Sequence, residues 1–83
     1  MSIKKPKSKK MVQQERRLFA HNLRQARKSA KLTQESLTKI TGLSQAFISN
    51  VENAKSTINL DNAKTLADAV GQPLWKLLTP KNK

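Results

Sequence analysis

Residues 33–52, TQESLTKITGLSQAFISNVE, decide how this chain folds. They predict two short helices joined at Gly42, because glycine adopts the left-handed conformation that ends many helices without a side-chain clash. Thr33 and Ser44 belong to the residue types that cap helix N-termini, so they mark where the two helices begin. In the second helix Leu43, Ile48 and Val51 form an apolar side, and a polar face turns away from them. That face comprises Ser44, Gln45, Ala46, Ser49 and Asn50.

The composition agrees with one small helical domain. A chain of 83 residues has room for a single core, and with 36% apolar but 4% aromatic residues that core must consist mainly of Leu, Ile, Val and Ala. There are 2 glycines, 3 prolines and no alternating apolar pattern of strand type. Helix-favouring residues are abundant, so the sequence predicts an all-α fold.

Periodic apolar residues place the other helices. A first helix is expected to begin between residues 11 and 15 and to end near residue 30, with an inner stripe of Val12, Phe19, Leu23, Ala26 and Ala30. The helix that begins after Thr33 has an inner face of Leu32, Leu37 and Ile40.

Two further helices are expected after a polar loop at residues 53–58. Asn59 caps a fourth helix that ends at Gly71, and Pro73 starts a short fifth helix at the position that tolerates a missing N–H. The buried side of the fourth helix is Leu60, Ala63, Leu66, Ala67 and Val70.

The positive charge is concentrated at the N-terminus. The formal net charge is +12, and residues 1–31 hold eleven Lys or Arg and one acid. We expect residues 1–11 to be a flexible basic arm, because they contain almost no apolar surface. Such an arm would contact phosphates and add a salt-sensitive, sequence-independent part to the affinity. It contains Lys4, Lys5, Lys7, Lys9 and Lys10.

Several classes of function are disfavoured. The chain has no cysteine and one histidine, His21, so no metal site, cofactor site or histidine-based triad is expected. The five acids are scattered and form no catalytic pair, which argues against an enzyme and a small-molecule ligand. No apolar run approaches membrane-spanning length, and no signal peptide is evident, so we expect a cytoplasmic protein.

Duplex DNA is the partner that these features favour. A short helix that presents small amide and hydroxyl groups suits the base edges of a major groove. Gln45 and Asn50 each offer a donor and an acceptor to adenine, and Ala46 fits a thymine methyl group. Residues 43–52 hold no Lys or Arg to grasp guanine, so base contacts that favour A·T pairs are expected.

From Leu23 to Leu78 the chain resembles the small helix-turn-helix domains of the phage-repressor, or Xre, family. The resemblance is carried by LRQARKSAKLTQESL, ITGLSQAFISNVEN and LDNAKTLADAVGQPLWKLL. It implies a five-helix, lambda-repressor-like domain over residues 12–79, between the arm and a charged tail at residues 80–83. The helix of residues 44–52 would then be the recognition helix.

The resemblance also implies roles for individual residues. Gln45, Ala46 and Asn50 stand where family members contact bases. Gln34 matches a glutamine that binds phosphate and braces the recognition helix, and Arg27 with Glu52 matches a structural ion pair. The positions expected to approach the DNA backbone are Gln34, Ser44, Phe47, Ser49 and Asn53, to which the charges of Arg24 and Lys55 are added; Phe47 suits the core as well.

Two residues depart from the family's pattern. Thr38 stands where the family usually has alanine because two helices pass closely there, so their crossing angle is in question. Ala54 stands where glycine is common after the recognition helix, and Asn53 is expected to take the left-handed turn in its place.

The apolar residues of the fifth helix exceed what one short helix buries on one side. Part of this set closes the core, and the surplus favours a homodimer, in which two copies read half-sites one helical turn apart. The set comprises Leu74, Trp75, Leu77 and Leu78.

These observations favour a transcriptional repressor or a restriction–modification controller protein. The alternative is an antitoxin that binds a toxin and regulates its own operon through the same helix-turn-helix. A non-specific nucleic-acid or ribosome-associated binder fits less well, because the sequence has few aromatic residues for stacking and its recognition helix carries no positive charge.

Overall fold

The computed structural model describes residues 13–80, which form five helices. They are α1 (Gln13–Ser29), α2 (Gln34–Thr41), α3 (Gln45–Glu52), α4 (Leu60–Ala69) and α5 (Leu74–Leu77). No strand occurs between residues 13 and 80, so the all-α prediction is confirmed. The basic arm, Val12 and residues 81–83 lie outside the described residues.

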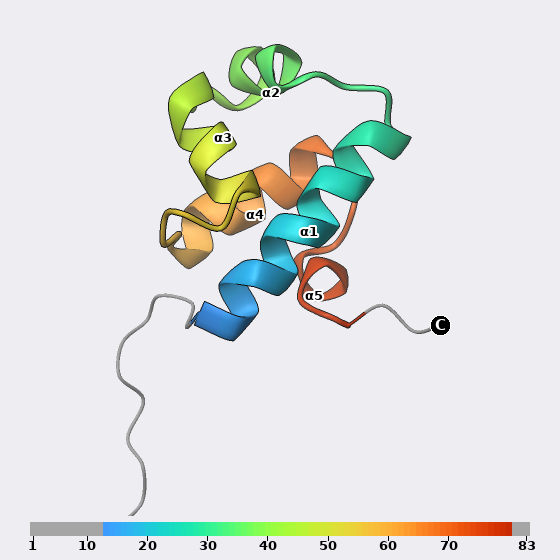
Figure 1. Cartoon of the computed structure of the whole chain (residues 1–83). Coiled ribbons are helices and arrows are strands. Elements are labelled where there is room, and N and C mark those ends of the chain that lie inside the picture. The colour runs from blue at the N-terminus through green and yellow to red at the C-terminus, as the bar shows by residue number, and fades with distance from the viewer. Residues whose placement is uncertain (1–12, 81–83) are drawn as a thin grey trace, which may run out of the picture.

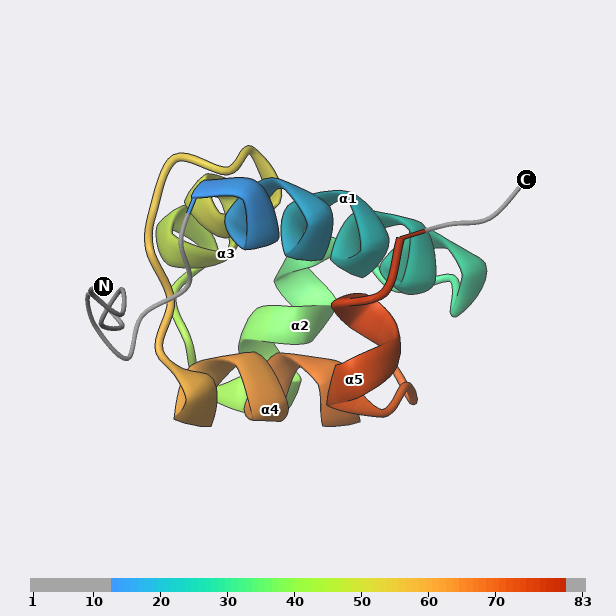
Figure 2. The same ribbon diagram turned by 90° about the horizontal axis from the view of Figure 1, so that it is seen from below.

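The helices enclose the core in a ring. α1 packs on α3 and α5, α2 packs on α3 and α4, and α4 packs on α5. Figure 1 shows α2 and α3 together at one end of the domain, and Figure 2 shows α1 and α4 on opposite sides, with α5 at one end between them. Each helix therefore needs to cover the core with only one face. The largest fully buried side chains are Phe19, Leu23, Leu37, Ile48, Leu66 and Val51.

Local hydrogen bonds fix where the central helices begin. The Thr33 Oγ1 accepts from the Ser36 backbone N at 2.9 Å, and the Ser44 Oγ accepts from the Phe47 N at 3.0 Å. The Asn59 Oδ1 caps α4 in the same way, at 2.8 Å from the Asn62 N. All three caps were predicted from residue type, because such side chains satisfy free N–H groups of a first helical turn.

Apolar exposure differs from the sequence prediction at three positions. Ile40 and Leu60 were assigned to inner faces, yet each is 56% exposed, and Ala30 is exposed as well. Each lies at or just beyond a helix end, where the neighbouring helices no longer cover it. The periodicity identified the inner face correctly but not how far the neighbours extend along it.

The end of α3 also differs from the prediction. Asn53 has φ −98° and Ala54 has φ +59°, so the alanine and not the asparagine takes the left-handed turn. The Ala54 N donates to the Val51 O at 3.0 Å, and the Lys55 N donates to the Asn50 O at 2.8 Å. This pair of bonds is the Schellman arrangement, which requires a left-handed residue at the position that Ala54 occupies.

Two smaller findings complete the comparison. Pro73 is the N-cap of α5 and not its first helical residue. The hydroxyl of Thr38 is buried and has no hydrogen-bond partner among the described residues, while α2 and α3 remain packed together. The threonine is therefore accommodated between the helices with an unsatisfied polar atom.

Replacing Ala54 by glycine is expected to stabilise the domain. The alanine Cβ is strained at φ +59°, and the relief outweighs the extra chain entropy of glycine, giving up to about 1 kcal/mol. For a domain of this size the melting temperature should rise by about 4–8 °C per kcal/mol. The control Ala46→Gly, inside α3, should lower it. Thermal unfolding followed by circular dichroism tests both; a lower melting temperature for Ala54→Gly would contradict the strain argument.

Candidate nucleic-acid interface

The outer face of α3 is polar and accessible. Gln45, Ala46 and Asn50 are exposed, and Ser49 is half-buried. On the opposite face Ile48 and Val51 are buried completely or nearly so. The structure thus brings the three residues predicted to contact bases onto one free surface, which the buried side holds against the core.

Phe47 has a place in the interior. Its side chain is half-buried and packs against the hydrophobic core. Of the two roles open from the sequence, the structure thus provides the core role. Its backbone N–H is also used, because it donates to the Ser44 cap at 3.0 Å.

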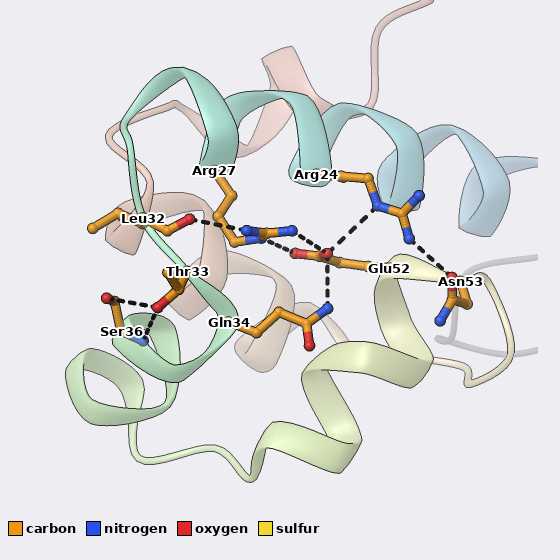
Figure 3. Close-up of polar contacts among 8 residues, drawn as sticks. All are labelled: Arg24, Arg27, Leu32, Thr33, Gln34, Ser36, Glu52 and Asn53. Atoms are coloured by element: carbon orange, nitrogen blue, oxygen red, sulfur yellow. Dashed lines mark hydrogen bonds and ion pairs between the residues drawn. The ribbon is translucent and has the colours of Figure 1, made fainter.

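The carboxylate of Glu52, the last residue of α3, collects donors from two other helices (Figure 3). From α1, the Arg27 Nε donates to the Glu52 Oε2 at 2.6 Å and the Arg27 Nη2 donates to the Oε1 at 3.0 Å. From α2, the Gln34 Nε2 donates to the Oε1 at 3.1 Å. The ion pair of Arg27 and Glu52 is therefore present, and the Gln34 amide binds the same carboxylate.

Arg27 reaches a second element as well. Its Nη1 donates to the backbone O of Leu32, in the connection between α1 and α2, at 2.9 Å. One guanidinium thus links the end of α3 to the segment that leads into α2. This contact could not be read from helical spacing, because it depends on where the chain turns after α1.

Burial and neighbouring groups act in opposite directions on the pKa of Glu52. Burial raises it, whereas hydrogen bonds from Arg27 and Gln34 and the positive charges of Arg27 and Arg24 lower it. The neighbours outweigh burial, so the pKa lies below its ordinary value of 4.5 and the group is ionised at neutral pH. A buried carboxylate that stays charged keeps its donors in place.

Arg24 and Asn53 were predicted separately as backbone-contacting residues, and the structure joins them. The Arg24 Nη2 donates to the Asn53 Oδ1 at 2.9 Å, and the Arg24 Nε lies 3.6 Å from the Glu52 Oε1. The Arg24 side chain remains 39% exposed. A cation from α1 is thereby held at the C-terminal end of α3. Lys55, two residues further along the chain, is exposed.

The residues of the fifth helix divide as their number suggested. Leu77 is buried, Leu74 and Leu78 are half-buried against the core, and Trp75 is 67% exposed. The sequence analysis missed what fastens this helix: buried Asn22 of α1 donates through its Nδ2 to the Leu77 O at 2.9 Å and the Thr79 O at 3.0 Å. A polar residue beside the apolar stripe of α1 was the only signal for it.

Other kinds of site find little support in the part of the chain that the structure covers. Residues 13–80 bring no three His, Cys, Asp or Glu side chains together in a way that would hold a metal ion. None of the helices within those residues combines the length and apolar character needed to cross a bilayer.

Comparison with known proteins identifies the family. A helix-turn-helix family model matches residues 23–74. Control protein C.SmaI of Serratia marcescens is 36% identical over 62 residues, which is 75% of this chain and 74% of that protein. A hypothetical transcription factor of Neisseria meningitidis is 34% identical over 65 residues, which is 78% of this chain and 61% of the relative's length.

Solved structures agree with this similarity. The crystal structure of the hypothetical transcription factor NHTF from Neisseria superposes with a TM-score of 0.76 at 30% identity, covering 95% of this chain and 91% of that one. The restriction-modification controller protein C.AhdI from Aeromonas hydrophila gives a TM-score of 0.72 at 28% identity, covering 77% and 97%. The predicted five-helix fold is thus confirmed, and the chain belongs to the helix-turn-helix family of DNA-binding transcriptional regulators.

Proposed function

We propose that this regulator recognises its operator by inserting α3 into the major groove of duplex DNA. Gln45 and Asn50 hydrogen-bond to base edges, and Ala46 packs against a thymine methyl group. The supporting observation is that their exposed face is backed by buried Ile48 and Val51 and by the carboxylate of Glu52. A rigid reading face avoids the entropy cost of ordering the helix when DNA binds.

Contacts to the sugar-phosphate backbone surround this face. Two helix N-termini point free backbone N–H groups and a positive dipole end toward the phosphates, at Gln34 and at Ser44. Cationic and polar side chains at the other end of α3 add to them. The remaining proposed backbone contacts are Arg24, Ser49, Asn53 and Lys55, and the lysines of residues 1–11 supply a salt-sensitive arm.

We further propose that the protein acts as a homodimer over residues 12–79. The single reading face is small, and two-fold dimers place two such faces one helical turn apart. Trp75, 67% exposed on α5, supplies apolar surface for a second copy. An occupied operator blocks transcription, which makes a repressor or a controller protein of the C.SmaI and C.AhdI kind the simplest role.

The relatives bear on the alternatives. They are control proteins and transcription factors by name, and this favours regulation over the antitoxin role that the sequence had left open. Binding to chromosomal DNA places the protein in the cytoplasm, on the nucleoid.

The double variant Gln45→Ala with Asn50→Ala tests the reading face. Each bidentate base contact contributes about 1–3 kcal/mol of discrimination, so preference for a site selected from random duplexes should fall at least tenfold. The slope of affinity against salt should stay the same, because no phosphate contact is removed. Titration of selected and scrambled duplexes measures both quantities.

Gln25→Ala is the matched control, since it removes an exposed helical amide from α1 near α5. Its discrimination should equal that of the wild type. If the double variant discriminates as well as this control, α3 is not the element that reads the bases.

Glu52→Gln tests the structural role of the carboxylate. Removing the charge leaves Arg27 uncompensated in a partly buried site, so the free energy of unfolding at pH 7 should fall by about 3 kcal/mol. DNA affinity should fall with it, although Glu52 is buried and contacts no DNA in the proposed complex. Urea unfolding gives the stability. The control Asp68→Asn breaks a pair that is 63% and 62% exposed, and it should cost no more than about 0.5 kcal/mol.

The difference between wild type and Glu52→Gln should depend on pH. Because the folded pKa of Glu52 is lowered, its stabilising contribution is complete well above 4.5 and is lost as the pH falls through the lowered value. The two unfolding free energies should therefore converge in acid. A constant difference from pH 7 to pH 2 would show that the charge of Glu52 is not what matters.

Trp75→Gln tests the proposed dimer. The side chain is mostly exposed, so the variant should fold, but the apolar area that it offers a second copy is lost. Analytical ultracentrifugation should show a shift from dimer to monomer at micromolar concentration, together with weaker operator binding. An unchanged sedimentation profile would place the dimer contact elsewhere.

A further inference from the structure

The outer face of α1 carries a line of cationic side chains. Arg17, Arg24 and Lys28 are separated by seven and four residues, which places them within one narrow sector of the helix, with His21 between the first two. Arg17, His21 and Lys28 are exposed. We call Arg17, Arg24 and Lys28 the basic stripe. At 1.5 Å per residue it runs for about 17 Å, roughly five base-pair steps of duplex DNA.

Nearby acids do not neutralise this stripe. Within residues 13–80 the ion pairs are those of Arg24 and Arg27 with Glu52 and of Lys64 with Asp68, so Arg17 and Lys28 belong to none. Glu15, the acid in α1, lies two residues from Arg17 and hence on the far side of the helix. An unbalanced row of cations raises the local potential and suits a polyanion.

The stripe is continuous with the proposed reading surface. Its central member, Arg24, donates to the Asn53 Oδ1 at 2.9 Å and lies 3.6 Å from the Glu52 Oε1, at the C-terminal end of α3 (Figure 3). Asn53 and Glu52 hold the guanidinium there before any DNA is present. A duplex lying along α3 and past Asn53 therefore meets the basic stripe next.

We propose that the basic stripe binds the phosphates of duplex DNA that flanks the base pairs read by α3. This inference rests on the proposed function, and it extends the binding site from α3 and the ends of α2 onto α1. Duplex phosphates fit the stripe better than a single strand does, because its exposed members include no aromatic side chain on which bases would stack.

The test uses the full chain, the double variant Arg17→Gln with Lys28→Gln, and two duplexes. One duplex spans only the selected site, and the other extends it by about one helical turn, or ten base pairs, on each side. Affinity is measured over a salt series. The control variant Lys64→Gln with Lys76→Gln removes the same charge from exposed positions of α4 and α5. Circular dichroism and sedimentation confirm that all variants fold and assemble alike.

The stripe variant should lose on the order of tenfold in affinity for the long duplex at about 0.1 M salt, and its salt slope should fall by about two, as expected for two lost phosphate contacts. Its loss on the short duplex should be smaller, and its preferred site should not change. The control should match the wild type on both duplexes.

Two results would overturn the inference. Affinity equal to that of the control on both duplexes would leave the stripe without a DNA contact, and equal losses on both would place it against the core site and not the flanks. Either result is compatible with base reading by α3, because that role is tested separately by Gln45→Ala with Asn50→Ala.

Discussion

The arrangement of the DNA-facing elements depends on the carboxylate of Glu52. It ends α3, is buried, and accepts hydrogen bonds from Arg27 of α1 and Gln34 of α2 at 2.6–3.1 Å. Apolar contacts through Ile48 and Val51 bury one face of α3 but impose little direction on it. Hydrogen bonds to a charged group are directional and strong. A buried ion pair need not add net stability, yet breaking it is costly, so α3 has one well-defined orientation.

Charge and specificity are separated in this molecule. The reading face of α3 is neutral, since the charged side chain in residues 44–52 is Glu52 and that group is buried. Positive charge lies around it, in Arg24, in Lys55 and along α1. Phosphate contacts position a protein on DNA and depend on salt, whereas base contacts select the sequence. A neutral reading helix within a chain of net charge +12 lets the two contributions be altered independently.

Most of the fold could be predicted because its signals are local. Thr33, Ser44 and Asn59 cap helices through bonds to residues three positions later, and Gly42 and Gly71 have the positive φ expected of them. The errors arise where the answer depends on other parts of the chain. Ile40 and Leu60 follow the correct period but lie beyond the reach of neighbouring helices. Ala54 is left-handed because the Schellman bonds at the end of α3 require it, against the preference of the residue itself.

The candidate site divides in the same way. The sequence by itself determined the α-helical class, the polar face of Gln45, Ala46 and Asn50, and the family to which the chain is similar, because spacing along a helix decides which side chains share a face. Only the tertiary structure decided that Arg24 pairs with Asn53, that Gln34 binds Glu52, and that Trp75 is left exposed. These pairs lie 29 and 18 residues apart in the chain. Their side chains meet because the ring of helices closes around one core, and no local propensity encodes that distance.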